Sequence, residues 1–342
     1  MYTPPFNITP EIFRLAAEIA EHAGAISVKM SGKLPSPMLR KNNNIKTIHS
    51  SLAIENNTLS LQQVTDIVDG KHVFGSPDEI QEVKNAIEAY KLMLKLDAFS
   101  EKDLLKAHGL MMQHLVKRAG KYRAGGVGVF DSQKCVHLAP PAERVPMLMG
   151  DLFEWVSTTD THPLISSCVF HYEFEFIHPF EDGNGRMGRF WQTLLLSRWK
   201  KLFAWLPVET IVKVNQQEYY KMIAQADASG DSTCFVEFML RCLLSAIKNA
   251  DYSTAEVPNK IPNKVPNNLR SKYPDVVSIA WEILELVVGN PYITAQEISA
   301  RLGISDRMVR KHLATLKSLG IISREGGRKK GFWSINLSSP DA

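Results

Sequence analysis

The sequence predicts an all-α helical bundle with a small β-hairpin, followed by a smaller C-terminal domain of helices and two strands. From residue 9 to about residue 250, apolar residues recur at the i, i+3, i+4 and i+7 spacing of helices that bury one face. A proline-rich stretch then separates this region from a second one with its own helical and strand patterns. At 342 residues, the chain is long enough for two compact domains.

Helical periodicity is clear in six segments of the first region, at residues 10–22, 79–96, 101–116, 145–156, 166–177 and 189–200. The pattern breaks once, at residues 123–141, where Val and Leu alternate around a polar turn before two prolines. We expect a hairpin that projects from the helical body as a flap. Its second strand contains Val136, His137 and Leu138.

The composition is that of a globular protein, with 44% hydrophobic and 22% charged residues. The net charge of +4 is too small to mark the whole chain as a binder of nucleic acid or membranes, so any basic patch is local. No apolar run approaches the roughly 20 residues of a membrane helix, and the first residues lack the features of a secretory signal. We therefore expect a cytoplasmic protein with no membrane contact. The cysteines show no CxxC pairing, so we expect buried thiols rather than metal or disulfide chemistry at Cys135, Cys168, Cys234 and Cys242.

The proline-rich stretch has Pro258, Pro262 and Pro266 at intervals of four, and each proline removes a backbone donor that a helix would need. Such a segment extends by about 3.1 Å per residue and acts as a semi-rigid spacer. The expected organisation is an N-terminal helical region at 1–100, a central helical core at 101–250, a linker at 251–272 and a C-terminal domain at 273–342.

The C-terminal domain is predicted from a helix at 276–288, a short β segment at 292–294 and two further helices. Thr294 and Glu297 form a capping box for the first of these helices, which ends at Gly303, and Asp306 is the expected cap of the second. Two strands around a basic Gly-Gly tip follow. This order of elements resembles a winged helix-turn-helix domain.

Basic residues gather in the second helix and the strands of this domain. Residues 307–330 contain eight Lys or Arg and one acidic residue, a local charge of +7. This pattern favours DNA binding, with the helix in the major groove and the strands on phosphate. A docking or dimerisation surface is the alternative, and a homodimer is left open.

The residues that carry chemistry lie together at 178–189, in the run HPFEDGNGRMGR. Pro179 disfavours the α conformation at the residue before it, so the preceding helix should end at His178. The glycine-rich loop can present backbone N–H groups as a nest, and it leads into a helix that begins near Arg186. Arg186 and Arg189 share a face of that helix and repel each other, so we expect a polyanion such as a triphosphate between them. Asp182 offers one oxygen ligand for Mg²⁺ beside phosphates.

These residues resemble the signature of the Fic family, His-x-Phe-x-(Asp/Glu)-Gly-Asn-Gly-Arg-x-x-Arg. The match covers every defined position: His178, Phe180, Asp182, Gly183, Asn184, Gly185, Arg186 and Arg189. The likeness extends from about residue 48 to residue 240, including the hairpin. It implies a protein adenylyltransferase of the Fic fold, which moves AMP from ATP to a hydroxyl side chain of a target protein.

The resemblance also implies a role for each matching residue. His178 would be the general base, Asp182 would hold Mg²⁺, and Phe180 would anchor the loop in the core. The loop amides with Asn184 would stabilise phosphoryl charge, the two arginines would hold the β- and γ-phosphates, and the hairpin would dock the target by strand addition. The expected nucleotide contacts are Gly183, Asn184, Gly185, Arg186, Met187, Gly188, Arg189, Tyr219 and Asp227. Many relatives have Asn at the last of these positions.

A second motif, upstream, reads Ser51-x-x-x-Glu55-Asn56. A capping box at Ser60 and Gln63 places Glu55 in the last turn of the preceding helix, where a carboxylate opposes the helix dipole and needs a cationic partner. In Fic relatives the motif (Ser/Thr)-x-x-x-Glu-(Gly/Asn) pairs its glutamate with the final arginine of the loop and inhibits the enzyme. The resemblance therefore implies self-inhibition.

Three further hypotheses remain beside ATP- and Mg²⁺-dependent AMP transfer. The same site could remove AMP from a modified target, with Glu55 orienting a water molecule. The chain could instead be a transcriptional regulator that senses a nucleotide and reads DNA, although a sensor needs no base at position 178. Some relatives are phosphotransferases, but those with a kinase-like reaction replace the second loop glycine by lysine, and Gly185 therefore favours AMP transfer.

Overall fold

The computed structural model describes residues 2–30, 35–126, 128–131, 134–249, 277–289, 293–325 and 332–335. The chain divides into two compact units, Met1–Tyr252 and Ser253–Ala342. The proline-rich segment with Pro258, Pro262 and Pro266 lies outside the described residues.

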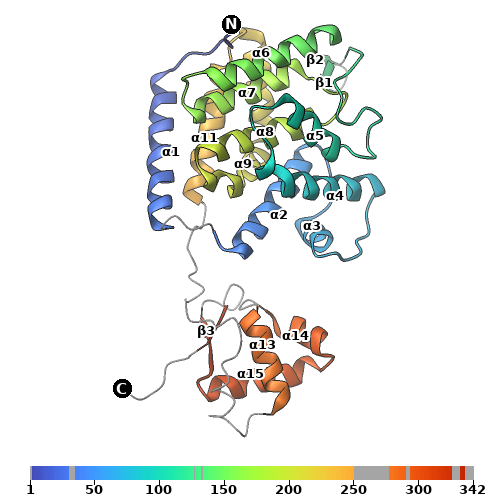
Figure 1. Cartoon of the computed structure of the whole chain (residues 1–342), viewed down its shortest axis with the longest axis vertical. Helices are drawn as coiled ribbons and strands as arrows, with labels where there is room; N and C mark the ends of the chain where they lie inside the picture. Colours follow the sequence, from blue (N-terminus) through green and yellow to red (C-terminus); the bar gives the residue numbers. More distant parts are fainter. Residues whose placement is uncertain are drawn as a thin grey trace. The chain divides into compact units, whose positions relative to one another are not determined.

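The first unit is a helical bundle (Figure 1), as the apolar periodicity predicts. Short 3₁₀ turns occupy Met93–Lys95, Ala142–Arg144 and Lys201–Trp205. None of the described helices is long and apolar enough to cross a membrane. The α-helices of this unit are α1 (Pro10–Lys29), α2 (Pro37–Ile54), α3 (Leu61–Val68), α4 (Pro77–Leu92), α5 (Glu101–Met111), α6 (Val145–Thr158), α7 (Pro163–Ile177), α8 (Asn184–Trp199), α9 (Val208–Val214), α10 (Gln216–Ser229) and α11 (Thr233–Asn249).

The centre of the bundle is the pair α7 and α8, which pack along each other. Nearly every residue of both helices is buried, so each is covered by neighbours on all sides. Both helices carry buried aromatic residues, among them Phe170, Phe174 and Trp191, and the indole N–H of Trp191 donates to the carbonyl of Ala98. The loop between α7 and α8 is therefore held at both ends by buried helices.

The N-terminal helices complete this core. α1 lies along α11, and α2 packs on α9 and reaches the first half of α8. The capping box of Ser60 and Gln63 is present at the start of α3, so α2 has already ended before it, with Glu55 as its C-cap residue. The arrangement carries the end of α2 to the N-terminal end of α8.

Two short strands, β1 (Gly128–Asp131) and β2 (Lys134–Leu138), pair antiparallel, with a register shift between Val129 and Phe130. The turn at 132–133 and the strand side chains, including those of Val136, His137 and Leu138, lie outside the described residues. The flap and its docking role therefore stay predictions.

The second unit contains α13 (Ser278–Gly289), α14 (Ala295–Leu302), α15 (Asp306–Ser318) and the antiparallel pair β3 (Ile322–Glu325) and β4 (Phe332–Ile335). A separate apolar core joins them, built on Ile283, Leu284, Ile298, Val309 and Leu316. The predicted basic tip at 326–331 lies outside the described residues.

Two details of this unit correct the sequence analysis, while the capping box of Thr294 and Glu297 is confirmed. The N-cap of α15 is Ser305, whose hydroxyl accepts from the N–H of Met308, and Asp306 is the first helical residue. Serine and aspartate both favour the N-cap position, so the sequence alone could not decide which of these two neighbouring residues caps the helix. Ile293 and Thr294 form no strand, and Tyr292 lies outside the described residues.

Candidate active site

His178 is the residue that ends α7. It adopts the left-handed conformation, with φ 49° and ψ 59°, and its N–H donates to the carbonyl of Phe174 at 3.0 Å. The proline after it was expected to remove it from the α region, and it does, although into the left-handed rather than the extended region. Its Nδ1 lies 3.3 Å from the carbonyl oxygen of Glu175, which can only accept. This contact places the ring proton on Nδ1 and the basic lone pair on Nε2.

The loop after His178 is closed by its own side chains. Phe180 is fully buried, as expected for an anchor, and stacks on His108 with 3.6 Å between ring centroids. The Asn184 side chain accepts from the N–H of Phe180 and donates to its carbonyl, both at 2.9 Å. These two contacts engage the side-chain oxygen and one of the two amide protons of Asn184. The role expected for this residue in stabilising phosphoryl charge stays a prediction.

Little space surrounds Gly183 and Gly185, and Gly183 also has a left-handed conformation. Gly183 is the N-cap of α8 with φ 83°, and a Cβ there would lie 2.6 Å from the sulfur of Met112. A Cβ on Gly185 would lie 2.3 Å from Oε1 of Glu55. The helix starts at Asn184, two residues earlier than the sequence analysis expected, because the glycine makes the turn into it. The loop N–H groups therefore lie at the N-terminus of a long buried helix, an environment that favours anions.

The two arginines of α8 already have carboxylate partners within the chain. Arg186 is buried and donates to Glu82 at 2.9 Å and to both oxygens of Asp182 at 3.0 and 3.1 Å. These acidic residues balance the arginine charges where no polyanion is bound, and the expected phosphate contacts of the two arginines stay a prediction. Glu82, on α4, was missed because it lies 104 positions from its partner and in no motif.

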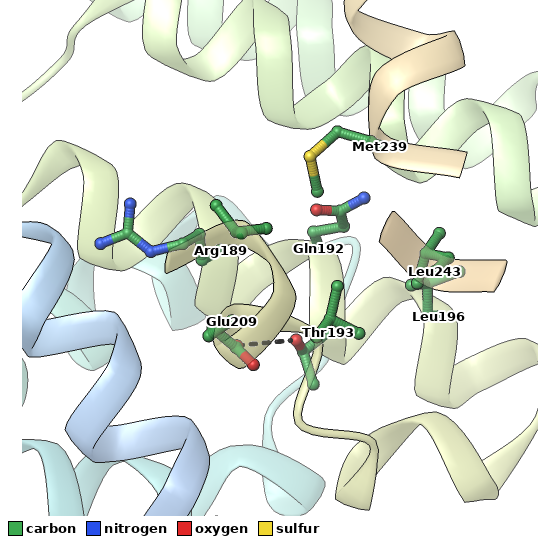
Figure 2. Close-up of a pocket in the computed structure, with 9 residues that line it drawn as sticks. Arg189, Gln192, Thr193, Leu196, Glu209, Met239 and Leu243 are labelled. Atoms are coloured by element: carbon green, nitrogen blue, oxygen red, sulfur yellow. Dashed lines mark hydrogen bonds between the residues drawn. The ribbon is translucent and has the colours of Figure 1, made fainter. Parts of the chain in front are cut away.

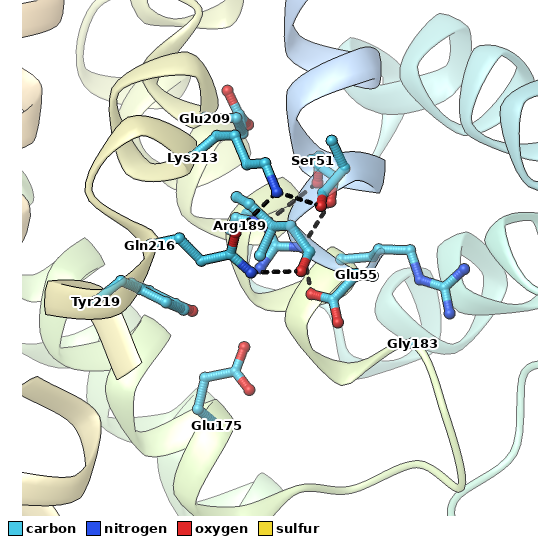
Figure 3. A network of polar contacts seen from close by, with 12 residues as sticks. Ser51, Glu55, Glu175, Gly183, Arg189, Glu209, Lys213, Gln216 and Tyr219 are labelled. Carbon is cyan, nitrogen blue, oxygen red and sulfur yellow. Dashed lines mark hydrogen bonds and ion pairs between the residues drawn. The ribbon is translucent and has the colours of Figure 1, made fainter. Parts of the chain in front are cut away.

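Arg189 is held by the end of α2 (Figure 3). Its Nη2 donates to Oε1 of Glu55 at 2.7 Å and to the carbonyl of Ser51 at 3.1 Å, and its Nε donates to the Ser51 hydroxyl at 3.2 Å. Asn56 follows in the left-handed conformation and turns the chain away. Burial would lower the pKa of Arg189, but the charge of Glu55 raises it above its ordinary value. Within the described structure its Nη1 is buried with no acceptor, beside Gly185.

His108 is a further site residue that the sequence analysis missed. Its Nδ1 accepts from the N–H of Gly120 at 2.8 Å, so Nε2 carries the proton and donates to the carbonyl of Asp182 at 3.0 Å. Burial lowers its pKa to about 4. A histidine on the apolar face of a helix has no sequence signal that separates it from an ordinary core residue.

The neutral state of His108 predicts a pH-dependent stability. The unfolded chain takes up a proton near pH 6.5 and the folded chain only near pH 4, so acid favours unfolding over this interval. The stability advantage of the wild type over His108→Gln should therefore shrink as the pH falls from 6.5 to 4, by on the order of 3 kcal/mol. Denaturant unfolding of both chains across this range measures the difference, and a gap that is constant with pH would contradict it.

Asp182 is the residue expected to hold Mg²⁺. Its side chain is 59% exposed and is paired with Arg186, and its Oδ1 accepts from the N–H of Gly183. The described residues contain no cluster of three His, Cys, Asp or Glu side chains that could hold a metal by themselves. One accessible carboxylate fits an ion that shares its coordination with substrate phosphates, but not an ion bound by protein alone.

Tyr219 and Asp227, the expected nucleoside contacts, both bond to α7. Tyr219 is 1% exposed and its hydroxyl lies 3.1 Å from Nε2 of His171, while Asp227 accepts from the hydroxyl of Tyr172 at 2.9 Å. Met187 is fully buried, and Gly188 lies against His171. Tyr219, Met187 and Gly188 are therefore packed against α7 or within the core, whereas Asp227 is half-buried, and the expected nucleotide contacts of all four residues stay predictions.

A cavity of about 10 Å³ lies behind Arg189 (Figure 2). Its polar wall includes Glu209, whose Oε2 is buried without a hydrogen-bond partner among the described residues, and Thr193, which donates to the other oxygen at 3.5 Å. Burial raises the pKa of Glu209 to about 7. The space suits one water molecule and is far too small for a nucleotide.

Family models match both units of the chain. The Fic/DOC family model matches residues 98–196, and a model of an HTH domain matches residues 282–332. Curated relatives called protein adenylyltransferase Fic are 30% identical, from Nematostella vectensis over 223 residues and from Aedes aegypti over 232 residues. These matches cover 62% and 64% of this chain but only 50% and 44% of the relatives. The chain thus spans half of their length or less.

Solved structures extend the comparison to the whole chain. A Fic domain containing signaling protein from Bacteroides thetaiotaomicron is 19% identical, with a TM-score of 0.55 over 70% of this chain and 94% of its own, which shows a shared fold. A Fic family protein from Desulfovibrio desulfuricans is 43% identical, with a TM-score of 0.72 over 99% of this chain and 100% of its own. The chain therefore belongs to the Fic family and carries a C-terminal HTH domain.

Proposed function

We propose that the chain is a protein adenylyltransferase, which transfers AMP from ATP to a hydroxyl side chain of a target protein. The observation that carries the proposal is the loop between α7 and α8, where a histidine with a basic Nε2 stands beside a glycine-rich helix N-terminus and two buried arginines. The names of the curated relatives support it.

The geometry suggests how the residues share the reaction. Nε2 of His178 removes the proton of the attacking hydroxyl, whose oxygen bonds to the α-phosphorus while the bond to the β-phosphate oxygen breaks and pyrophosphate leaves. The N–H groups of Asn184 and Gly185 stabilise charge on the α-phosphoryl oxygens. Arg186 and Arg189 orient the outer phosphates once their carboxylate partners release them. Bound at Asp182, Mg²⁺ would neutralise phosphate charge.

We further propose that the conformation in which Glu55 binds Arg189 is an inhibited one. Glu55 binds Arg189, and its Oε1 lies so close to Gly185 that no Cβ would fit between them. A phosphate that approaches the first turn of α8 would meet this carboxylate at short range. Like charges repel strongly where little water separates them, so Glu55 opposes a productive triphosphate position.

ATP labelled separately at the α- and γ-phosphates tests the proposed function. The chain with Glu55→Gly is incubated with each label, and protein-bound label is measured after denaturing separation. Label from the α-phosphate alone is the expected result. Label from the γ-phosphate would indicate a phosphotransferase, and no label with any candidate protein would leave a sensor or an AMP-removing enzyme.

We also propose that the HTH domain binds duplex DNA through phosphate contacts. Arg307 and Lys311 are exposed on α15, whereas Arg310 pairs with Asp306 at 2.5 Å and Arg324 lies over the Trp333 ring at 4.8 Å. Arg307 and Lys311 are therefore the first contacts expected with DNA.

Binding of the full chain to a DNA duplex should weaken by about a hundredfold between 50 and 200 mM salt, as expected for about four phosphate contacts. Fluorescence anisotropy measures the affinity, and Arg307→Glu with Lys311→Glu should lower both the affinity and the salt dependence. Absence of binding at low salt would assign this domain to protein contacts.

A further inference from the structure

Arg123 lies just before β1 and is 3% exposed, although it carries a charge. Its Nε donates to the carbonyl of His178 at 2.8 Å, and its Nη2 donates to the carbonyl of Ile177 at 3.3 Å. Its own backbone N–H donates to the carbonyl of Pro179 at 2.9 Å. One residue therefore binds three consecutive carbonyl groups at the point where α7 ends and the catalytic loop begins.

The same guanidinium also binds the base of the β1–β2 pair. Nη1 donates to the carbonyl of Gly125 at 2.9 Å, three residues before β1, and Nη2 donates to the carbonyl of Pro140 at 2.5 Å, two residues after β2. The planar fork of arginine sets the directions of these donors. The two ends of the strand pair and the backbone of His178 are thus held against one rigid group.

A stabilising role alone does not explain this choice of residue. Among the described residues, the four hydrogen-bond partners of the guanidinium are carbonyl oxygens, and Glu143 acts on its charge only from a distance. A charge taken out of water usually costs more than neutral contacts return. Two of these carbonyls end α7, where a cation is favoured, and His178 stands in a left-handed conformation that a residue other than glycine adopts at a cost. The hydrogen bonds of Arg123 therefore hold His178 in its left-handed conformation and link its backbone to both ends of the strand pair.

We propose that Arg123 is a positioning residue that couples the base of the β1–β2 pair to the backbone of His178, and so sets the imidazole relative to a target segment at β2. The proposal rests on the proposed adenylyl transfer for its effect on rate. The guanidinium of Arg123 contacts none of the groups that the proposed mechanism assigns to nucleotide binding, so the affinity for ATP should not change. An error of about 1 Å in the position of a reacting group lowers a rate by about a hundredfold.

The test compares Glu55→Gly with the double variant Glu55→Gly/Arg123→Lys, because lysine keeps the charge but not the fork. We expect the single-turnover rate of AMP transfer to the chain itself to fall by about ten- to a hundredfold, with less than a threefold change in the dissociation constant of ATP. Arg144→Lys, an exposed arginine beside the same strands, is the matched control and should change neither value. An unchanged rate, or an equal loss of ATP affinity, would overturn the proposal.

Hydrogen exchange of the same chains without nucleotide separates this proposal from the proposed function. Arg123→Lys should raise exchange at the amides of residues 123–126, of Ala139 and of residues 177, 178 and 180 together, whether or not the chain transfers AMP. Faster exchange at only one of these segments would refute the coupling. If Arg123→Lys does not fold, Arg123→Gln, which keeps two donors, takes its place. No α-label on the Glu55→Gly chain would instead refute adenylyl transfer, and the exchange data would still decide the coupling.

Discussion

Replacing His178 with alanine in the Glu55→Gly chain should lower AMP transfer by about 10² to 10⁴-fold and leave ATP binding nearly intact. The histidine acts on the proton of the attacking hydroxyl, so its contribution appears in the transition state and not in the bound substrate. The phosphates are contacted by the loop N–H groups and the arginines, which the substitution does not touch. Transfer of α-labelled AMP and the dissociation constant of ATP are the two measurements.

The left-handed backbone of His178 requires a second variant, because alanine disfavours φ 49° and could move the loop. Asparagine tolerates this conformation better than most residues and supplies no base in the neutral pH range. His178→Asn should therefore be as inactive as His178→Ala, and its affinity for ATP should be equal to or higher than that of His178→Ala. If His178→Asn retained most of the activity, the residue would be a structural cap. If both variants lost ATP binding in proportion to rate, the base role would be wrong.

The sequence was sufficient for the helical bundle and for the loop, because both depend on residues that are close along the chain. The spacing of apolar residues defines helix faces locally, and Pro179, Gly183 and Gly185 act on their own backbone or immediate surroundings. The pair of Glu55 and Arg189 joins residues 134 positions apart, and only the family resemblance connected them before the structure did.

The remaining contacts could not be predicted because their partners are backbone groups or distant carboxylates. Glu82 accepts from both Arg186 and the side chain of Asn57, at 2.9 and 2.8 Å, and so joins the loop to the turn after α2. His108 and Arg123 bind carbonyl oxygens, which every residue has, so no residue type marks the partner. The motif assigns Asn184 to phosphate, and only the structure shows that its side chain also forms hydrogen bonds with the backbone of Phe180.

Replacing Glu55 with glycine should raise AMP transfer, including self-modification, by at least about tenfold over the wild type. Arg189 can direct its fork at Glu55 or at a γ-phosphate, but not at both in one geometry, because the guanidinium is planar and its donors have fixed directions. While Glu55 holds Nη2, the outer phosphate lacks its anchor, and a misplaced α-phosphate reacts about a hundredfold more slowly for an error near 1 Å. Glycine is tolerated at the C-cap position that Glu55 occupies, so the helix should persist.

The same substitution leaves the buried charge of Arg189 without its carboxylate, which predicts a second, independent effect. The Glu55→Gly chain should unfold at a lower temperature than the wild type, and ATP should raise its unfolding temperature by more than it raises that of the wild type, because the triphosphate replaces the lost partner. Thermal unfolding with and without ATP, beside transfer of the α-label, measures both effects.

Glu55→Gln is the matched control for shape and should activate as well, since the neutral amide removes the charge. Glu55→Gly/Arg189→Ala should be inactive, because nothing then anchors the outer phosphate. Transfer by Glu55→Gly no faster than by the wild type would refute the inhibition, and a loss of AMP removal in that variant would make Glu55 a group that orients water.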